Sequence, residues 1–319
     1  MSFDGNGNYT VPPGTAAVTG TAIDSAKYNA FLIDLQTALS KALLRDGQSA
    51  AQANIPMGSK KLTGLAAGSV AGDSVRFEQL FAQTHLRAFG AVGDGVTNDA
   101  AAIQAAHDSL PAVGGTIMVG KGSFLHSTAL TFTKRVRLIG EGVAITNAQS
   151  PSEFRKGSGI AGDGFILSGS GTTVEGVAFR GVTGNTGDGV VVKAGRITFR
   201  DCAFYAMGTD GLRIGTDAGG ENCNLWMLDN CKAKSNGRHG VFISEGSTAP
   251  VDASGGTCLH LDAQVNGADG LAFGYSNLNT IIGGAYQQNA NYGLRFSANS
   301  SYNALYGGDY ETNTLAQIR

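Results

Sequence analysis

Six glycines recur at similar intervals in the second half of the chain, and each is directly preceded by an ionisable or hydroxyl-bearing residue. These residues are Asp163, Asp188, Asp210, His239, Asp269 and Tyr292. If equal positions of successive repeats stack as neighbouring strands, consecutive side chains lie about 5 Å apart and alternate ones about 10 Å apart. Two carboxylates at such separations carry out retaining or inverting glycoside hydrolysis. The candidate catalytic residues are therefore Asp188, Asp210 and His239, which belong to three successive repeats.

The same residues have a structural interpretation. Asp-Gly is a common turn dipeptide, so the aspartates also fit a column of turn residues without any chemistry. In favour of catalysis, carboxylates that are crowded together raise one another's pKa, and this allows one of them to act as an acid. Both interpretations stay open on the sequence.

Two longer repeats predict a groove beside this column. They contain additional loops over residues 216–223 and 244–257, which bring four acidic residues toward one side: Asp217, Glu221, Glu245 and Asp252. These loops would wall a groove over the outward residues Arg213 and Phe242, which suit a sugar ring. Plain solvated loops are the alternative. The candidate substrate-binding residues are Arg213, Phe242, Glu245 and Asp269.

The elements that position these residues form a repeat. Each glycine is followed by an apolar, a variable and an apolar residue, as in Gly211-Leu212-Arg213-Ile214, and the glycines are 25, 22, 29, 30 and 23 residues apart. This alternation is typical of a strand with one buried face. A second segment with β-strand composition precedes each of the later glycine-containing segments, over residues 197–204, 225–233, 258–265 and 280–286. Each repeat therefore contains at least two short strands joined by Asn/Gly turns.

A repeat of this length cannot bury its own apolar face, so it must stack on its neighbours as a solenoid. The predicted fold is mainly β, a right-handed parallel β-helix. An asparagine stands four residues before the glycine in four repeats and predicts an internal hydrogen-bonded ladder of Asn185, Asn236, Asn266 and Asn289. Cys202 and Cys231, each nine residues before a glycine, are predicted to stack in the core. The four cysteines lack zinc-type spacing and favour reduced core thiols over a metal site.

A helix is predicted near the N-terminus, over residues 26–44, with Asp24 or Ser25 as its cap. Its larger apolar residues are spaced by three and four, as in the seam of a helical bundle: Tyr28, Phe31, Leu35, Ala38 and Ala42. Two heptads are short evidence for a coiled coil. An amphipathic helix packed on its own domain is the alternative.

Residues 45–80 contain several short motifs in a fixed order: NIPMG at 54–58, KLTGLA at 61–66, DSV at 73–75 and QL at 79–80. They resemble a segment common near the N-termini of bacteriophage tail fibres and tailspikes. Upstream, Gly20-Thr21, Tyr28-Asn29 and Arg45-Asp46-Gly47 look like the virion-attachment part of that family. The resemblance implies a trimeric region that docks to the phage tail. We expect a virion-attachment region at 1–60, a linker and neck helix at 61–86, and the β-helix at 87–319.

The following stretch, residues 86–127, resembles the opening of the pectate lyase-like β-helix superfamily. The motifs are FGA at 89–91, GDG at 93–95, ND at 98–99, AIQAA at 102–106 and GG at 114–115. Independently of the resemblance, residues 97 or 98 can cap a helix whose Ile103, Ala106 and Leu110 share one face. Such a helix would cover the open end of the solenoid. Asp94 and Asp99 fit turn and cap positions there.

The short sequence motifs around Asp188, Asp210 and His239 resemble the ordered Asp, Asp, His signature of the polygalacturonase family. They read NTGDG at 185–189, GTDG at 208–211 and GRHG at 237–240. The resemblance is incomplete. That family has paired aspartates in its middle motif, where only Asp210 stands here, and no Arg-x-Lys motif follows.

Composition excludes several classes of function. The 319 residues include 48 glycines and only 15% charged residues, with a formal net charge of -2, so nothing indicates a nucleic-acid partner. No apolar run approaches the roughly 20 residues of a membrane span, and the first residues lack the features of a signal peptide. Because no phosphate loop, dinucleotide-binding motif or metal cluster is present, we expect no cofactor and no metal.

Together these features predict a homotrimeric phage tailspike, located in the virion tail and assembled in the host cytoplasm. It would bind and depolymerise a host surface polysaccharide, with a glycoside hydrolase favoured over a lyase. A lyase would typically need carboxylate-bound calcium and a basic groove residue, and nothing selects Arg213 or Arg295 for that role. The alternative is a non-enzymatic tail fibre or adaptor that binds only a receptor or another fibre.

The C-terminal end carries a further expectation. Asn313 follows Asn289 by 24 residues, so the next repeat begins just before Arg319. A solenoid open at this point would expose its core and unpaired strand groups. We therefore expect either a longer natural protein or a second fibre chain docked on this end.

Overall fold

The computed structural model of the chain describes residues 20, 22, 24–41, 84–144, 149–215, 222–243 and 253–319. The chain has two compact units, Met1–Leu65 and Ala66–Arg319. The tail-fibre motifs at 54–66 and the neck helix lie outside the described residues, and the domain boundaries at residues 60 and 86 stay predictions.

The first unit contains helix α1 (Ser25–Lys41). The N-cap predicted at this position is Asp24, whose Oδ1 accepts a hydrogen bond from the backbone N–H of Ala26 at 2.9 Å. This contact satisfies one of the N–H groups that the first helical turn leaves free. The predicted helix is therefore confirmed up to Lys41, and residues 42–44 lie outside the described part of the chain.

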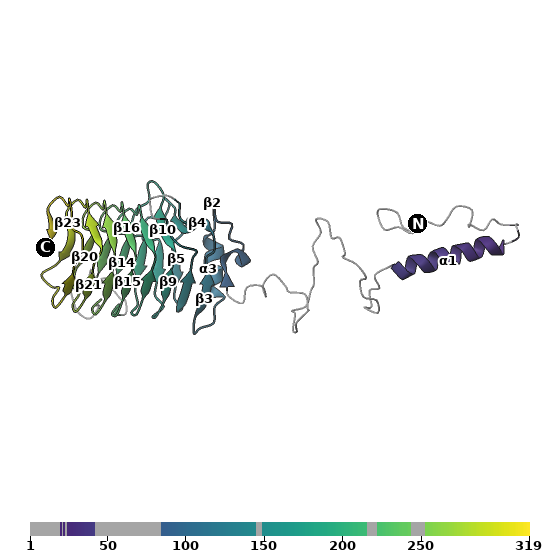
Figure 1. Ribbon diagram of the computed structural model, residues 1–319, viewed down its shortest axis with the longest axis horizontal. Helices are drawn as coiled ribbons and strands as arrows, with labels where there is room; N and C mark the ends of the chain where they lie inside the picture. The colour runs from purple at the N-terminus through teal and green to yellow at the C-terminus, as the bar shows by residue number, and fades with distance from the viewer. Residues whose placement is uncertain are drawn as a thin grey trace. The chain divides into compact units, whose positions relative to one another are not determined.

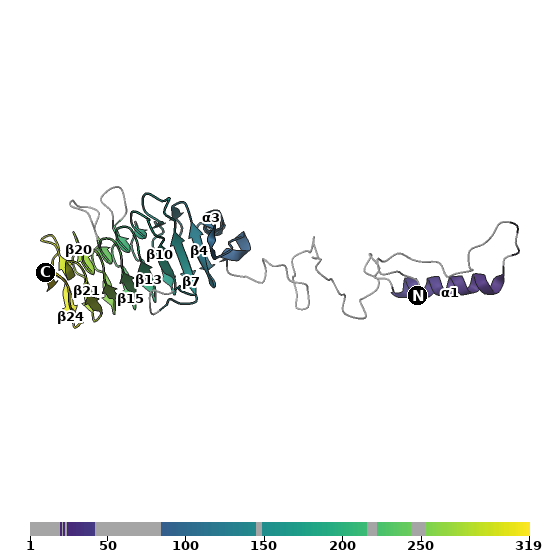
Figure 2. The same cartoon turned by 90° about the horizontal axis from the view of Figure 1, so that it is seen from above.

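The second unit is a parallel β-helix, which confirms the predicted fold (Figures 1 and 2). Its strands form three parallel sheets, and within each sheet every strand is hydrogen-bonded to the next one named. The first sheet consists of β1 (Thr84–His85), β3 (Gly115–Met118), β6 (Val136–Ile139), β9 (Thr173–Glu175), β12 (Thr198–Arg200), β15 (Met227–Asp229), β18 (Thr257–Leu259), β21 (Thr280–Ile282) and β24 (Ala304–Tyr306).

The second sheet consists of β2 (Asp94–Asn98), β4 (Gly122–His126), β7 (Ser152–Lys156), β10 (Ala178–Gly181), β13 (Ala203–Tyr205), β16 (Lys232–Lys234), β19 (Asp262–Gln264) and β22 (Ala285–Gln287). The third sheet consists of β5 (Leu130–Phe132), β8 (Phe165–Leu167), β11 (Val190–Val192), β14 (Leu212–Ile214), β17 (Val241–Ile243), β20 (Leu271–Phe273), β23 (Tyr292–Phe296) and β25 (Ala316–Ile318). Consecutive strands enter different sheets, so each turn of the chain from β3 to β23 adds one strand to each sheet.

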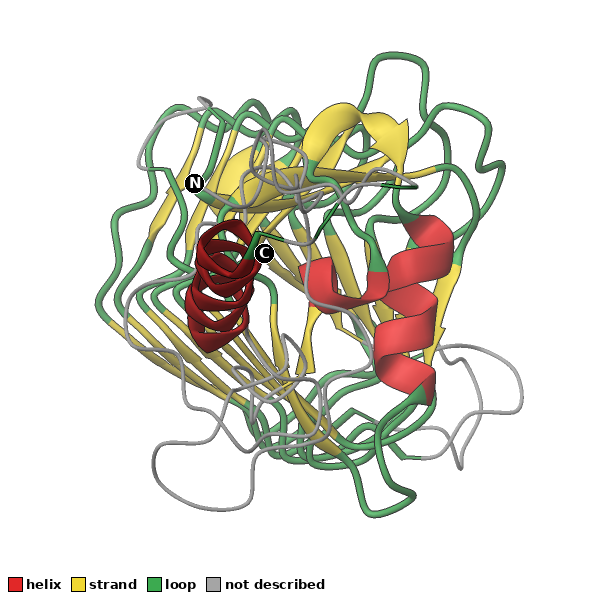
Figure 3. Ribbon diagram, turned by 90° about the vertical axis from the view of Figure 1, so that its right-hand side faces the viewer, coloured by secondary structure: helices red, strands yellow, loops and turns green. Residues whose placement is uncertain are grey.

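The strands predicted after the repeat glycines form the third sheet, in the predicted register. Val190 pairs with Leu212, and Val241 pairs with Leu271 one position after their glycines. Equal positions of the repeats therefore stack as columns about 4.8 Å apart. In Figure 3, which views the stack end-on, the strands surround a common core.

Each predicted second run contains two strands rather than one. The run over 197–204 is divided into β12 and β13 at Asp201, whose φ is 50°. The equivalent corners at Asn230 and His260 have a φ of 51° each. One residue in the left-handed region bends the chain sharply out of one sheet and into the next. The sequence does not reveal this corner, because buried apolar residues continue on both sides of it.

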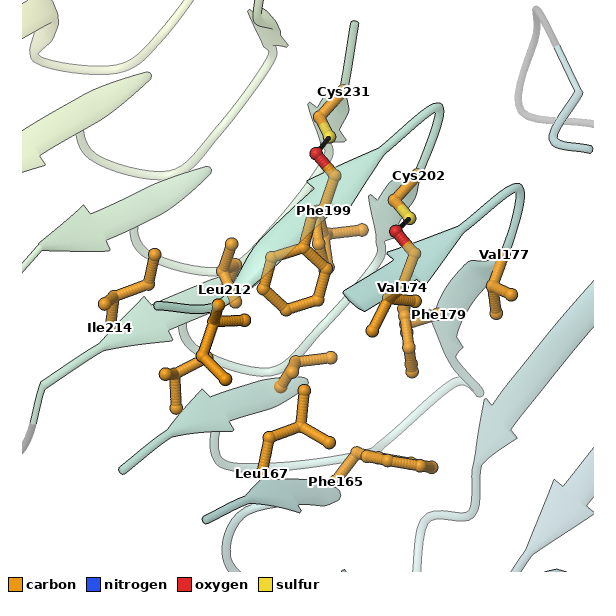
Figure 4. Close-up of a cluster of buried hydrophobic side chains, with 14 of the residues drawn as sticks. Phe165, Leu167, Val174, Val177, Phe179, Phe199, Cys202, Leu212, Ile214 and Cys231 are labelled. Carbon is orange, nitrogen blue, oxygen red and sulfur yellow. Dashed lines mark hydrogen bonds between the residues drawn. The ribbon is translucent and has the colours of Figure 1, made fainter. Parts of the chain in front are cut away.

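The core consists of the inward side chains of all three sheets, and it includes Cys202 and Cys231 as predicted (Figure 4). Cys202 Sγ donates to the carbonyl oxygen of Val174 at 3.4 Å, and Cys231 Sγ donates to that of Phe199 at 3.5 Å. Burial raises the pKa of the Cys202 thiol well above its usual value. The Cys202 thiol is therefore protonated, and both sulfur atoms form weak hydrogen bonds in the core.

The predicted asparagine ladder is present over four successive rungs, from Asn236 to Asn313. The Nδ2 of Asn236 donates to Asn266 Oδ1 at 3.0 Å, and Asn266 and Asn289 donate to their successors at 2.9 Å each. The sequence also predicts Asn185 in this ladder, but Met207 occupies the rung between it and Asn236. The prediction is wrong for Asn185, because a longer turn at 182–187 places its amide against Ala206 and Gly208 instead.

Helix α3 (Ala100–Asp108) covers the N-terminal end of the core, as predicted (Figure 1). Its apolar face is buried through Ile103 and Ala106, and Leu110 follows on the same side. The buried His107 fastens the helix to the first rungs, since its Nε2 accepts the N–H groups of Thr133 and Lys134 at 3.1 Å each. The helix therefore closes the end of the stack that would otherwise expose apolar side chains.

Asp94 and Asp99 have structural contacts at the start of this unit. Asp94 Oδ1 accepts the N–H groups of Val96 and Thr97 and closes a turn. Asp99 precedes α3 but makes no side-chain cap. Its carboxylate instead accepts the N–H groups of Val92 and Gly93, at 2.7 and 3.0 Å.

A buried histidine in β4 predicts acid sensitivity. Burial lowers the pKa of His126 from 6.5 to about 4. Between about pH 6.5 and pH 4, His126 is protonated in the unfolded chain but stays neutral in the folded chain. The free energy of unfolding is therefore largest above about pH 6.5 and decreases as the pH falls toward 4. The expected loss is roughly 3 kcal/mol, or 1.4 kcal/mol per pKa unit.

The variant His126→Asn removes this titration. Urea unfolding at about pH 7 and about pH 4.5 should show a smaller loss of unfolding free energy for the variant than for the wild type. An equal loss in both proteins would show that His126 does not carry the acid sensitivity.

Candidate functional site

The residues before the repeat glycines form a continuous column at the entry to the third sheet. Asp188 Oδ1 accepts the backbone N–H of Asp210 at 3.0 Å, and Asp210 Oδ1 accepts that of His239 at 3.0 Å. The Nδ1 of His239 accepts the N–H of Asp269 at 3.2 Å, and Asp269 Oδ1 accepts that of Tyr292 at 3.2 Å. Each side chain therefore binds the main chain of the next rung.

Arginines from the outer face of the third sheet and its entry turns pair with the three aspartates. Arg213 Nε lies 2.8 Å from Asp188 Oδ2. Arg238 Nε donates to Asp210 Oδ1 at 2.8 Å, and Arg295 Nε donates to Asp269 Oδ2 at 2.6 Å. The three carboxylates are buried, and the arginines supply the hydrogen-bonded partners that buried carboxylates require.

Asp269 shows how these contacts affect ionisation. Burial alone would raise its pKa, but the hydrogen bonds and charges of His239 and Arg295 outweigh that effect and leave the pKa below its usual value. The carboxylate is therefore ionised at neutral pH and acts as an acceptor for its neighbours.

The structure brings Asp188, Asp210 and His239 together in successive rungs, in the predicted column. All three are buried, and Asp210 has 0% exposure. Their oxygens and nitrogen are used by the main chain of the next rung and by the arginines. These contacts favour the column of turn residues, and the catalytic assignment of the three residues stays a prediction.

The predicted substrate-binding residues have different positions. Arg213 and Phe242 are paired on adjacent strands of the third sheet, on its outer face. Phe242 is only 8% exposed, because the His239 ring lies at 5.1 Å and the Arg238 guanidinium at 5.3 Å from it. It does not form an open platform among the described residues. The loop residues Glu245, Asp217, Glu221 and Asp252 lie outside the described part of the chain.

The first member of the column, Asp163, is more exposed than Asp188, Asp210, His239 and Asp269. Its side chain is 24% exposed. Burial and the charge of Asp188 together raise its pKa above the usual value, against the opposing effect of Arg213. Arg213 lies between the two carboxylates, with Nη2 3.5 Å from each oxygen of Asp163. Asp163 belongs to the predicted column but not to the predicted catalytic residues, because exposure is not readable from the sequence.

Residues 84–308 match the family model described as rhamnogalacturonase A/epimerase, pectate lyase-like. The match covers more than half of the chain. The chain belongs to this family. No curated protein matches the sequence.

Several solved structures are similar to this chain. ORF18 of Geobacillus virus E2 is 18% identical with a TM-score of 0.50, over 74% of this chain and 59% of that protein. This chain thus spans less than two thirds of that protein. The A-module of the Azotobacter vinelandii mannuronan C-5 epimerase AlgE6 is 22% identical with a TM-score of 0.47, over 73% and 77%. The phage phiAB6 tailspike, solved with oligosaccharides of Acinetobacter baumannii surface polysaccharide, is 16% identical with a TM-score of 0.39, over 70% and 47%.

In this pectate lyase-like chain a buried lysine, Lys156, holds the turn that carries Asp163. Its Nζ donates to the carbonyl oxygens of Gly162 at 2.6 Å and Asp188 at 2.9 Å, and also to that of Thr186. Burial lowers the pKa of Lys156 to about 8. One side chain thus fixes two neighbouring rungs of the column, and no sequence pattern indicated this role.

Neither a metal cluster nor a membrane-spanning helix is found in the described part of the chain. In the described ranges no three or more His, Cys, Asp or Glu side chains are grouped so that they could hold a metal ion. None of the helices that the structure describes is both long and apolar enough to cross a membrane.

Proposed function

We propose that the chain is a bacteriophage tailspike whose β-helix binds and depolymerises a surface polysaccharide of the host. The observation that carries this proposal is the partly exposed Asp163, which shares Arg213 with Asp188 on the outer side of the third sheet. The pectate lyase-like family and the tail-fibre motifs near the N-terminus support it.

The chemistry follows from the environment of the two carboxylates. Burial raises the pKa of Asp163, which favours the protonated form that a general acid needs to give a proton to the glycosidic oxygen as its bond to the sugar breaks. Asp188 stands in the next rung, about 5 Å away, which is the separation found in retaining glycoside hydrolases. Arg213 contacts both carboxylates. Asp163 is therefore the candidate acid and Asp188 the candidate nucleophile, while Asp210 and His239 support them from the following rungs.

A second candidate function is a tail fibre or adaptor that binds without cleaving. The burial of Asp188, Asp210 and His239 favours it, since a substrate reaches none of them without a rearrangement of the column.

Incubation of the protein with capsule or lipopolysaccharide of the host distinguishes these functions. Hydrolysis should release new reducing ends, whereas a lyase would also form unsaturated sugars. Binding without either product would favour the fibre. A protein that neither binds nor cleaves any host glycan would contradict both candidates.

We further propose that the chain is a homotrimer, docked to the tail through residues 1–60 and able to carry a second fibre chain at its C-terminal end. The trimer is supported by α1, in which Tyr28 is 52% exposed and Phe31 and Leu35 are partly exposed. The other seam positions, Ala38 and Ala42, lie outside the described side chains.

Light scattering should give the mass of three chains, and Phe31→Asp should lower that mass because a charge in the seam loses its solvation. Lys27→Glu, which lies on α1 outside the seam, is the matched control. A wild-type mass of one chain at micromolar concentration would contradict the trimer.

A further inference from the structure

An open pocket lies on the outer face of the first sheet, in the first rungs after α3. It is separate from the column at the entry to the third sheet. Its lining includes Val113, Thr116, Arg135, Arg137, Gly171 and Thr173. Two guanidinium groups, two hydroxyl groups and an apolar side chain thus meet in one hollow.

The floor of this pocket follows from the strand register. Thr116 pairs with Arg137, and Arg137 pairs with Thr173, so the three side chains occupy one outward column over β3, β6 and β9. Neighbouring members are about 4.8 Å apart. Arg137 Nη2 is 3.5 Å from Glu175 Oε2, and the two side chains are 58% and 35% exposed, so water screens this long ion pair and it is weak. Arg137 is therefore available to a stronger anionic partner.

Arg135 stands at the corner that leads into β6, and glycines flank it on both sides. Gly114 and Gly171 have φ values of 94° and 76°. A side chain at Gly114 would meet the Arg135 carbonyl oxygen at 2.0 Å, and one at Gly171 would meet Arg135 Nε at 3.4 Å. The contact at Gly114 excludes a side chain there, and the left-handed conformation of Gly171 favours glycine. Gly171 therefore places no side chain beside the Nε of Arg135.

Among the described residues the Arg135 guanidinium has one hydrogen bond, from Nε to the carbonyl oxygen of Gly171 at 3.3 Å. This bond orients the planar group and leaves its two terminal nitrogens for a ligand. A guanidinium in this state binds a carboxylate, sulfate or phosphate through two parallel hydrogen bonds. The nearby Lys134 adds positive charge, although its Nζ is held by the carbonyl oxygens of Asp108 and Leu110.

We propose that this pocket binds the anionic substituent of an acidic sugar unit. Arg135 and Arg137 clamp the anionic group, the hydroxyl groups of Thr116 and Thr173 bind the sugar hydroxyls, and Val113, which is 84% exposed, contacts the apolar edge of the ring. The inference rests on the proposed function in that the ligand is part of a polysaccharide. It adds a second binding site, on the first sheet and away from Asp163, for the anionic substituent.

Calorimetry on the full chain tests this with defined probes. Trigalacturonate provides the carboxylate, galactose 6-sulfate and galactose 6-phosphate provide the other two anions, and galactotriose is the neutral control. We expect at least one anionic probe to bind more tightly than galactotriose and to bind less tightly as the salt concentration rises. The anionic probe that binds most tightly identifies the substituent. Equal affinity for all four probes, or no binding of any of them, would overturn the proposal.

Two variants locate the binding. Arg135→Gln should lower the affinity for the preferred anionic probe about tenfold or more, because the variant loses a hydrogen bond to a charged group. Val113→Asp should abolish binding by repulsion without affecting folding, because the side chain is exposed. Arg200→Gln, which removes a charge paired with Asp229 on the same sheet face, should leave the affinity unchanged. Equal losses in Arg135→Gln and Arg200→Gln would show nonspecific charge attraction and contradict the site.

The test of this anion-binding site can fail or succeed independently of the test of the proposed function. If the anionic probes bind through Arg135 but the host polysaccharide is neither bound nor cleaved, the proposed function fails and this site stands. If Asp163→Asn stops cleavage while Arg135→Gln changes no affinity, the proposed function stands and this site is refuted.

Discussion

Replacing Asn266 by alanine is expected to lower the free energy of unfolding by roughly 3–5 kcal/mol, since several buried polar groups lose their partners at once. Asn266 Oδ1 accepts both the side-chain and the main-chain N–H of Asn236, and its Nδ2 donates to Asn289 and to the carbonyl oxygen of Ala233. Alanine removes the acceptor of the Asn236 main-chain N–H, and it removes one of the partners of Asn236 Nδ2, Asn289 Oδ1 and the Ala233 carbonyl oxygen inside the β-helix. Chemical denaturation of the second unit, followed by circular dichroism, measures the loss.

The control for this prediction is Asn299→Ala, an exposed asparagine outside the ladder. A surface change of this kind should shift the unfolding free energy by less than about 0.5 kcal/mol. A loss below about 1 kcal/mol in Asn266→Ala would show that the ladder contributes little to stability.

Replacing Asp163 by asparagine is expected to lower polysaccharide turnover by roughly 10²–10⁴-fold, because the amide has no proton to donate to the glycosidic oxygen. The side chain is partly exposed and the amide has the same shape, so binding of the polysaccharide and the melting temperature should stay close to those of the wild type. Reducing-end release at saturating substrate measures turnover. Full activity of Asp163→Asn would exclude this carboxyl as the acid.

Asp210→Asn is the informative comparison. If Asp210 is catalytic, as the sequence proposes, cleavage is abolished and thermal stability is nearly unchanged. If it serves the column, the amide loses its charge pairing with Arg238, and stability falls by roughly 1–3 kcal/mol with activity following the folded fraction. The 0% exposure of Asp210 favours the second outcome.

The repeat architecture could be predicted because every rung needs apolar residues at the same inward positions and the same types of residue in its turns. The alternation around Gly211 and Gly240 identified the strands of the third sheet, and the spacing of the asparagines identified the ladder from Asn236 to Asn289. The apolar face of α3 could be read from Ile103 and Ala106. Local patterns sufficed here, since period and turn chemistry are properties of neighbouring residues.

What the sequence could not decide depends on contacts between rungs. The Asp-Gly dipeptides identified the column in the sequence. Only the tertiary structure shows that Asp210 is paired with Arg238 while Asp163 is partly exposed. Lys156 reaches carbonyl oxygens 6, 30 and 32 residues away, which no local pattern reveals. The sequence by itself determined which residues share a column. The exposure and pKa of each member follow from side chains of adjacent rungs, because desolvation and pairing depend on what surrounds a group in space.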